Sequence, residues 1–185
     1  MILLAITPGA GFDRHRWAEV LHSGVDAFLI RENQLGTRTL LEAAAWCQDT
    51  APHVALWVAG RLDVALAAGC GLHAPEAYPE VPPDLVSLSR PLHVETQWEA
   101  RKGCGQLLVS PVFDSPGKGE PWGAARLHRF LDSQPPAGPR LLALGGLEPA
   151  NAGLLRHPRL AGLAAIRPFW MGDPRRAVAA FRTAE

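Results

Sequence analysis

One stretch of the chain places two adjacent glycines directly before the start of a helix, an arrangement that suits a bound phosphate. The apolar run Leu141 to Leu144 is typical of a buried strand, and Gly145 and Gly146 follow it at once. Pro149 then stands where the first turn of a helix is expected. Glycine lets the backbone turn sharply and approach a ligand, and N–H groups beside a helix N-terminus can hold a phosphate oxygen. An ordinary strand-to-helix turn has the same pattern, so the position of this stretch in the chain decides between the two.

Side chains that bind anions or move protons follow several other apolar runs. Such a mostly cationic set with one imidazole suits a small substrate that carries a phosphate and a carboxylate. Carboxylates are scarce at the same places, so Mg²⁺ would have few hard oxygen ligands, and we predict no metal site. The candidates are Arg31, Arg61, His93, Ser115, Lys118 and Arg167.

Each candidate also has a purely structural interpretation. Arg31 is suitably placed to pair with a carboxylate such as Asp63. Arg61 and Arg167 are also compatible with solvated surface arginines. A single histidine is weak evidence for catalysis, and we interpret His73, which also ends an apolar run, as a packing residue.

The composition excludes several classes of protein. With 185 residues, 48% of them hydrophobic, the chain is expected to form one globular domain over residues 1–185. Its 18 basic and 18 acidic residues cancel, which argues against a general binder of nucleic acid or of anionic membranes. No apolar run approaches the ~18 residues of a membrane span, and we identify no signal peptide. Cys47, Cys70 and Cys104 lack metal-type spacing and fit reduced thiols, so we expect a cytoplasmic protein.

The elements that must position the candidate residues alternate between strand-like and helix-like segments. Asp13 and Asp173 are predicted to cap helices, and Thr96 and Glu99 have the spacing of a capping box. The proline-rich segment 75–83 is expected to be a loop or a degenerate helix. Eight apolar segments are predicted strands: 2–6, 26–30, 54–58, 71–73, 85–88, 106–109, 141–144 and 161–166.

Eight nearly continuous apolar strands that alternate with about eight helices predict an α/β fold, a compact (β/α)₈ TIM barrel with minimal loops. The chain is shorter than the ~200 residues at the low end for this fold, so several helices must be short. The alternative is a doubly wound open sheet, which usually stops at five or six strands. In a barrel, the loops after strands seven and eight often hold phosphate. Gly145, Gly146 and Arg167 would lie in those two loops.

Short motifs lie in a fixed order along almost the whole chain. They are Leu4-Ala5-Ile6-Thr7, Leu29-Ile30-Arg31-Glu32, Gly60-Arg61-Leu62-Asp63-Val64-Ala65-Leu66, Gly71-Leu72-His73, Pro111-Val112-Phe113 with Ser115 and Lys118, Gly145-Gly146, and Gly162-Leu163-Ala164. Each is weak alone, but their order and spacing resemble the thiamine phosphate synthase/TenI family, which comprises small (β/α)₈ barrels of thiamine biosynthesis.

Departures from the family pattern indicate which branch of the family, synthase or TenI, the chain resembles more. The resembling synthases couple a hydroxymethylpyrimidine pyrophosphate to thiazole phosphate with Mg²⁺. Where they have Gln-x-Arg-x-Lys after strand two, this chain has Leu29, Arg31 and Asn33. Where they have Asn-Asp-Arg after strand three, it has Ala59-Gly60-Arg61, and Tyr78 replaces a second metal-binding aspartate. Because both carboxylates are lost, the resemblance argues against synthase activity.

The TenI branch, which lacks those carboxylates, resembles the chain more closely around Ser89-Arg90-Pro91-Leu92-His93. The matching histidine of that branch is the acid/base of a thiazole tautomerase. The resemblance therefore implies that His93 aromatises a thiazole-ylidene carboxylate phosphate without a cofactor. Arg167 departs from this pattern, because the family often has a phosphate-holding serine there.

The remaining candidates are expected to bind this small phosphorylated thiazole. We predict phosphate binding by Gly145, Gly146 and Arg167. The predicted substrate-binding residues are Arg31, Arg61, Ser115 and Lys118. Two alternatives stay open: a thiamine phosphate synthase, and a catalytically silent regulatory protein that binds a phosphorylated ligand. A homo-oligomer is compatible with all three.

Overall fold

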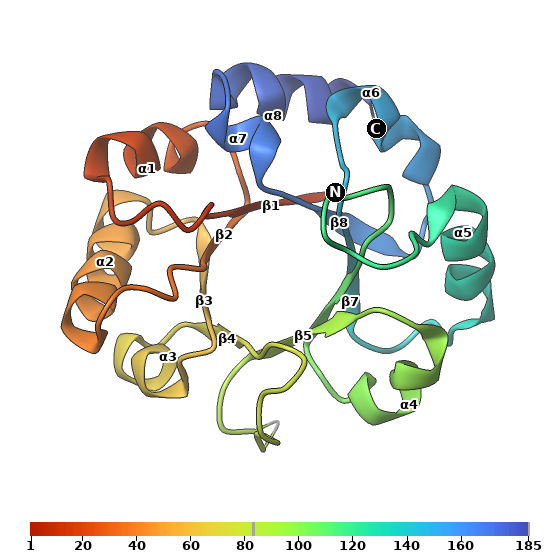
Figure 1. Cartoon of the computed structure of the whole chain (residues 1–185), viewed down its shortest axis with the longest axis horizontal. Coiled ribbons are helices and arrows are strands. Elements are labelled where there is room, and N and C mark those ends of the chain that lie inside the picture. The colour runs from red at the N-terminus through yellow and green to blue at the C-terminus, as the bar shows by residue number, and fades with distance from the viewer. Residues whose placement is uncertain (83, 185) are drawn as a thin grey trace.

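The computed structural model, which describes residues 1–82 and 84–184, shows parallel strands closed into a barrel with helices around it (Figure 1). Each strand pairs with the next along the chain, and the last pairs with the first. The predicted (β/α)₈ TIM barrel is thereby confirmed, and the open sheet is excluded. The strands are β1 (Ile2–Ile6), β2 (Ala27–Ile30), β3 (Ala55–Ala59), β4 (Gly71–His73), β5 (Leu88–Leu92), β6 (Gln106–Val109), β7 (Arg140–Leu144) and β8 (Leu160–Ala165).

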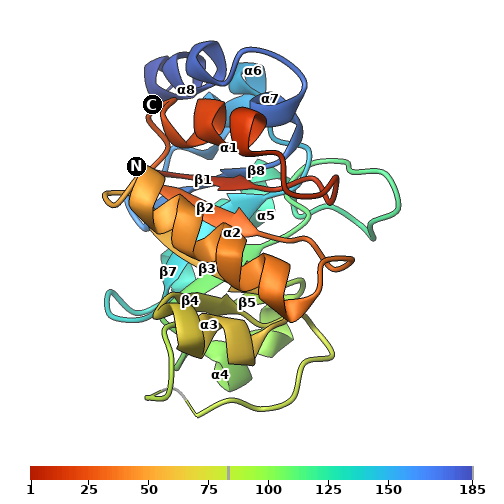
Figure 2. The same cartoon turned by 90° about the vertical axis from the view of Figure 1, so that its left-hand side faces the viewer.

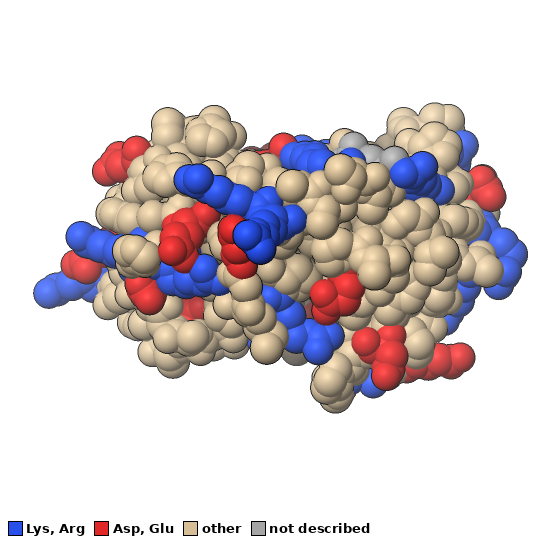
Figure 3. All heavy atoms as spheres, turned by 90° about the horizontal axis from the view of Figure 1, so that it is seen from above, with Lys and Arg blue, Asp and Glu red and all other residues tan. Residues whose placement is uncertain are grey.

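The helices surround the barrel, and several of them have only a single turn, as the short chain requires (Figure 2). None of the described helices is both long and apolar enough to cross a membrane. Acidic and basic side chains are interspersed over the face shown in Figure 3. The α-helices are α1 (Arg14–Leu21), α2 (Thr37–Thr50), α3 (Leu62–Ala68), α4 (Trp98–Arg101), α5 (Gly123–Ser133), α6 (Pro149–Ala152), α7 (Arg167–Trp170) and α8 (Pro174–Thr183), with 3₁₀ turns η1 (Glu95–Gln97) and η2 (Gly153–Leu155).

Two predicted caps are present and a third is not. The side chain of Asp13 accepts the N–H of Arg16 at 3.1 Å, and that of Asp173 caps α8 in the same way. The capping box predicted at Thr96 and Glu99 is wrong, because η1 precedes α4 and no side chain caps α4. The side chain of Gln97 instead accepts backbone N–H groups just before η1.

The fifth strand lies further along the chain than predicted. It spans Leu88–Leu92 and not 85–88, and the described residues between β4 and β5 form no helix. Arg90 interrupts the apolar pattern, yet its side chain is buried because the guanidinium donates to the carbonyls of Tyr78 and Pro79. Carbonyls of the connection between β4 and β5 thus supply the hydrogen-bond acceptors that the buried guanidinium of Arg90 needs. The shift places His93 directly after the end of β5.

The core has two parts, one between barrel and helices and one inside the barrel. Trp57 reaches into the interior, where an added Cβ on Gly71 would lie 2.3 Å from its indole ring. Glycine at position 71 therefore makes room for the tryptophan. The interior is a packed core and not a pore, so a ligand can enter only at an end of the barrel. Its buried members are Leu4, Ile6, Ala27, Leu29, Trp57, Ala59, Leu108, Leu142 and Ala164.

Candidate active site

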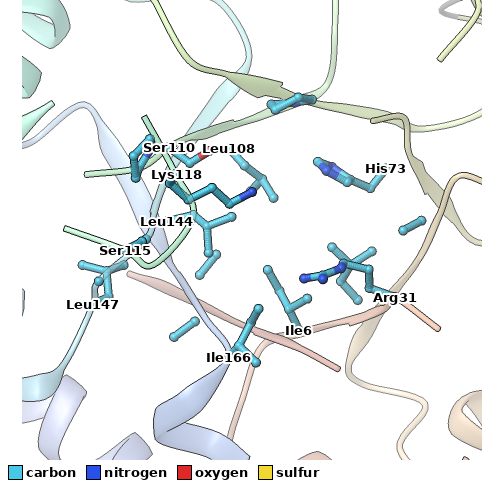
Figure 4. Close-up of a pocket in the computed structure, with 18 of the residues that line it drawn as sticks. Ile6, Arg31, His73, Leu108, Ser110, Ser115, Lys118, Leu144, Leu147 and Ile166 are labelled. Atoms are coloured by element: carbon cyan, nitrogen blue, oxygen red, sulfur yellow. The ribbon is translucent and has the colours of Figure 1, made fainter. Parts of the chain in front are cut away.

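A cavity of about 600 Å³ opens at the carboxyl ends of the strands (Figure 4). Apolar side chains near the ends of β1, β6, β7 and β8 form much of its wall, among them Ile6, Leu108, Leu144 and Ile166. Polar groups come from the loops that follow the strands. An apolar wall with a few placed polar groups is typical of a site for a small molecule.

Two cations point into this cavity from opposite loops. Arg31 follows β2, and its backbone N–H donates to the buried Thr7 hydroxyl at 2.8 Å, which fixes the start of the loop. Lys118 reaches in from the loop between β6 and α5 (Figure 4). Arg167 also lines the cavity, at the start of α7. Three of the predicted cations are therefore gathered around one space.

Arg61 is not among the described residues that line the cavity. Its guanidinium forms two hydrogen bonds with Asp63, at 2.9 and 2.5 Å, and a third with the Thr37 hydroxyl at 2.6 Å. This pairing lowers the pKa of the Asp63 carboxyl. Asp63 thus pairs with Arg61, whereas the sequence suggested Arg31 as its partner. The predicted role of Arg61 in substrate binding finds no support in this geometry.

The two glycines after β7 pack against the loop that follows β6. Gly145 has φ +103° and Gly146 has φ +61°, and an added Cβ on Gly146 would lie 2.5 Å from the Asp114 carbonyl oxygen. Ser115 lies beside Gly145 in the same corner of the cavity. Within the described part of the chain, the N–H of Gly146 has no hydrogen-bond acceptor. Two of the predicted phosphate residues, Gly145 and Gly146, therefore lie near Ser115, and the third, Arg167, lines the same cavity from the start of α7.

His93 lines the cavity, and hydrogen bonds hold both its ring and its backbone. Its Nδ1 lies 2.7 Å from the carbonyl oxygen of Ser110, and its backbone N–H donates to Gln97 at 2.8 Å. A carbonyl oxygen can only accept, so the neutral ring carries its proton on Nδ1. The lone pair is then on Nε2, which is 3.7 Å from a carboxylate oxygen of Glu76. In this tautomer, Nε2 is the ring nitrogen of His93 that can accept a proton.

His73 also points into the cavity, although its sequence context suggested simple packing (Figure 4). Its Nδ1 lies 3.0 Å from the Ser89 hydroxyl on the neighbouring strand. Burial, reinforced by the nearby Arg31 and Arg90 charges, lowers the pKa of this imidazole to about 4. The ring is therefore neutral near pH 7. Its place at the end of β4 and its membership of the motif Gly71-Leu72-His73 were the available signals, but packing and site histidines look alike in a sequence.

The depressed pKa of His73 predicts an acid-dependent loss of stability. The unfolded chain binds this proton near pH 6.5 and the folded chain only near pH 4. The contribution of the neutral ring is therefore complete above pH 6.5 and is lost as the pH falls toward 4. We expect the free energy of unfolding to fall by about 2 kcal/mol more in the wild type than in His73→Asn between neutral pH and about pH 4.5. Urea unfolding at both pH values measures this, and equal losses in both proteins would contradict it.

Fold and site together define the class of protein: a (β/α)₈ barrel with a small-ligand cavity at the carboxyl ends of its strands, where cationic groups surround a largely apolar wall. A family model described as thiamine monophosphate synthase (TMP-TENI) matches residues 3–169. The chain belongs to this thiamine monophosphate synthase/TenI family, as its motifs suggested.

Individual relatives agree with this assignment. The chain is 32% identical over 159 residues to a thiamine-phosphate synthase of Albidiferax ferrireducens, with 78% of this chain and 70% of that protein covered. A thiamine-phosphate synthase of Syntrophomonas wolfei is 27% identical over 159 residues, which cover 80% of this chain and 76% of that protein. Among solved structures, a thiamine phosphate pyrophosphorylase from Pyrococcus furiosus has a TM-score of 0.84 at 21% identity. The match covers 99% of this chain and 94% of that one. These relatives support an enzyme of thiamine biosynthesis.

The donor atoms of the cavity do not fit the Mg²⁺ of the synthase branch. By the motif resemblance, Gly60 and Tyr78 replace its two metal-binding carboxylates. Neither residue supplies a carboxylate, and the Tyr78 hydroxyl accepts the N–H of Leu62 at 3.2 Å. Glu76 is the one carboxylate among the described lining residues, and Arg101 already binds it. No group of three or more described His, Cys, Asp or Glu residues could hold a metal. Hard cations need several such oxygen ligands.

Proposed function

We propose that this protein is a TenI-like thiazole tautomerase, which aromatises a thiazole-ylidene carboxylate phosphate by proton transfer through a histidine. The observation that carries this proposal is the contact between His93 Nδ1 and the Ser110 carbonyl, which leaves the lone pair on Nε2, at the edge of the cavity. Histidine is the side chain that most often serves as a general acid/base, and this orientation presents its accepting nitrogen to the cavity. The cavity's donor set, which suits anions and not Mg²⁺, points in the same direction.

The proposed reaction moves one proton and needs no other reactant. Nε2 of His93 removes the proton from the ring carbon that bears the carboxylate, and the electron pair moves through the ring toward the exocyclic double bond. The imidazolium then returns a proton to the exocyclic carbon, the first carbon of the side chain, which becomes a methylene group. The ring becomes aromatic, and the histidine ends the cycle neutral. Substrate and product are isomers, so atoms and charge balance.

The remaining lining residues suit the rest of this substrate. Gly145, Gly146 and Arg167 would bind the phosphate, with Ser115 beside them. Arg31 and Lys118, which point into the cavity, would bind the carboxylate and favour the negative charge that develops when the proton leaves. The apolar wall would contact the ring.

The second candidate is a thiamine phosphate synthase, because both curated relatives have that name. Its metal-dependent coupling is the less favoured function, since Gly60 and Tyr78 occupy the positions of the two carboxylates. A silent regulatory protein that binds a phosphorylated ligand would retain the glycine loop without turnover.

The test is the rate of aromatisation of the thiazole-ylidene carboxylate phosphate, followed by ultraviolet absorbance in a buffer that contains a metal chelator. We expect a clear acceleration over buffer alone that added Mg²⁺ does not increase. Thiamine phosphate formed from the pyrimidine pyrophosphate and thiazole phosphate only with Mg²⁺ would instead establish the synthase. Binding of thiazole phosphate without either reaction would establish the regulatory protein.

A further inference from the structure

Hydrogen bonds join His93 to an arginine that lies outside the cavity. The side-chain oxygen of Gln97 accepts the backbone N–H of His93 at 2.8 Å, and Arg101 donates to the same oxygen at 2.9 Å. Arg101 also donates to the carbonyl of Pro91, two residues before the histidine. Its guanidinium is therefore bonded to groups on both sides of the His93 backbone.

The same arginine holds the carboxylate that faces the imidazole. Arg101 donates to Oε1 of Glu76 at 2.6 Å, and the Gln97 amide donates to that oxygen at 3.0 Å. The other carboxylate oxygen lies 3.7 Å from Nε2 of His93. Glu76 lies on the connection between β4 and β5, whose described residues form no helix that could hold it. Arg101 and Gln97 thus fix both the backbone of His93 and the group in front of its ring.

Arg101 is well suited to hold a fixed geometry. It is 9% exposed at the end of α4, although most arginines are exposed. A buried guanidinium must keep its acceptors, because a buried donor without a partner is costly. Its planar fork also sets the directions of its hydrogen bonds, which a flexible ammonium group would not.

We propose that Arg101 is a positioning residue for His93, which through Gln97 and Glu76 keeps Nδ1 of the imidazole on the Ser110 carbonyl and Nε2 in the cavity. This rests on the proposed function, in which His93 moves the proton. When the ring leaves the Ser110 carbonyl, the neutral form with its proton on Nε2 becomes accessible. That form has no lone pair on the nitrogen that faces the substrate.

The test compares the wild type with Arg101→Met by two readouts. Nitrogen-15 NMR of the His93 ring at about pH 8, where an ordinary imidazole is neutral, is expected to show the Nδ1–H form in the wild type and both forms in the variant. We expect kcat to fall about ten- to a hundredfold while KM changes little, because the proton-accepting atom is misplaced and the substrate contacts remain. A residue that only stabilised the fold would leave the tautomer unchanged in the folded enzyme.

Two further variants complete the test. Gln97→Met breaks the link between Arg101 and the His93 backbone, so it is expected to change the tautomer and kcat in the same way. It takes the place of Arg101→Met if that variant does not fold. Arg126→Met is the matched control, since it removes an ion pair with Glu95 but no contact to His93, and it should leave both readouts unchanged. An unchanged tautomer in Arg101→Met or Gln97→Met overturns the proposal. The NMR readout applies even to a wild type without tautomerase activity. Failure of the positioning proposal is therefore distinguishable from failure of the proposed function.

Discussion

Replacement of His93 by asparagine is expected to lower kcat for aromatisation by about 10²–10⁴-fold, the usual contribution of a general acid/base. Asparagine can still donate a hydrogen bond toward the Ser110 carbonyl, so the local structure should survive. It cannot accept a proton near neutral pH, and both proton transfers would then depend on water. KM should change little, because the groups proposed to bind the phosphate and carboxylate lie elsewhere. Initial rates at saturating substrate measure the effect.

The matched control for this prediction is His15→Asn, because His15 is an exposed histidine outside the described lining of the cavity. It should have wild-type kcat. Full activity of His93→Asn would contradict the proposed mechanism. If kcat falls in His73→Asn and not in His93→Asn, the proton transfer must be assigned to His73, at the end of β4.

Replacement of Gly146 by alanine is expected to weaken the binding of thiazole phosphate about ten- to a hundredfold. The residue has φ +61°, and the new Cβ would lie 2.5 Å from the Asp114 carbonyl oxygen, so the loop must move. A shift that removes one charge-assisted hydrogen bond to the phosphate costs about 1.5–3 kcal/mol of binding free energy. Strain and overpacking should also lower the free energy of unfolding by about 2–4 kcal/mol. Calorimetry measures the first effect and urea unfolding the second.

Gly103→Ala is the control for this substitution. An added Cβ on Gly103 meets nothing within 4 Å, and its φ is not positive, so neither quantity should change much. A folded Gly146→Ala protein that binds thiazole phosphate as tightly as the wild type would show that the glycine turn does not hold the phosphate. Because binding needs no turnover, the result is informative for all three candidate functions.

The sequence by itself determined the barrel and the location of its glycine turn. Eight apolar segments separated by helical ones leave few other folds, because parallel strands must be buried on both faces and need helical crossovers. The pair Gly145-Gly146 directly follows the apolar run of β7, and no distant contact is needed to place it at the carboxyl end of a strand. For the same reason His93, Arg31 and Lys118 were expected near one another from their order alone.

Only the tertiary structure decided which side chains reach the cavity. Arg61 follows a strand as Arg31 does, but Asp63 and Thr37 bind its guanidinium outside the cavity. The end of β5 was misplaced because Arg90 is a charged residue within a strand, and loop carbonyls distant in sequence make its burial possible. Arg101 is likewise fixed behind His93 by acceptors in β5, in η1 and on the connection between β4 and β5. Strand order follows from local apolar patterns, whereas the direction of a charged side chain depends on acceptors that only the folded chain brings within reach.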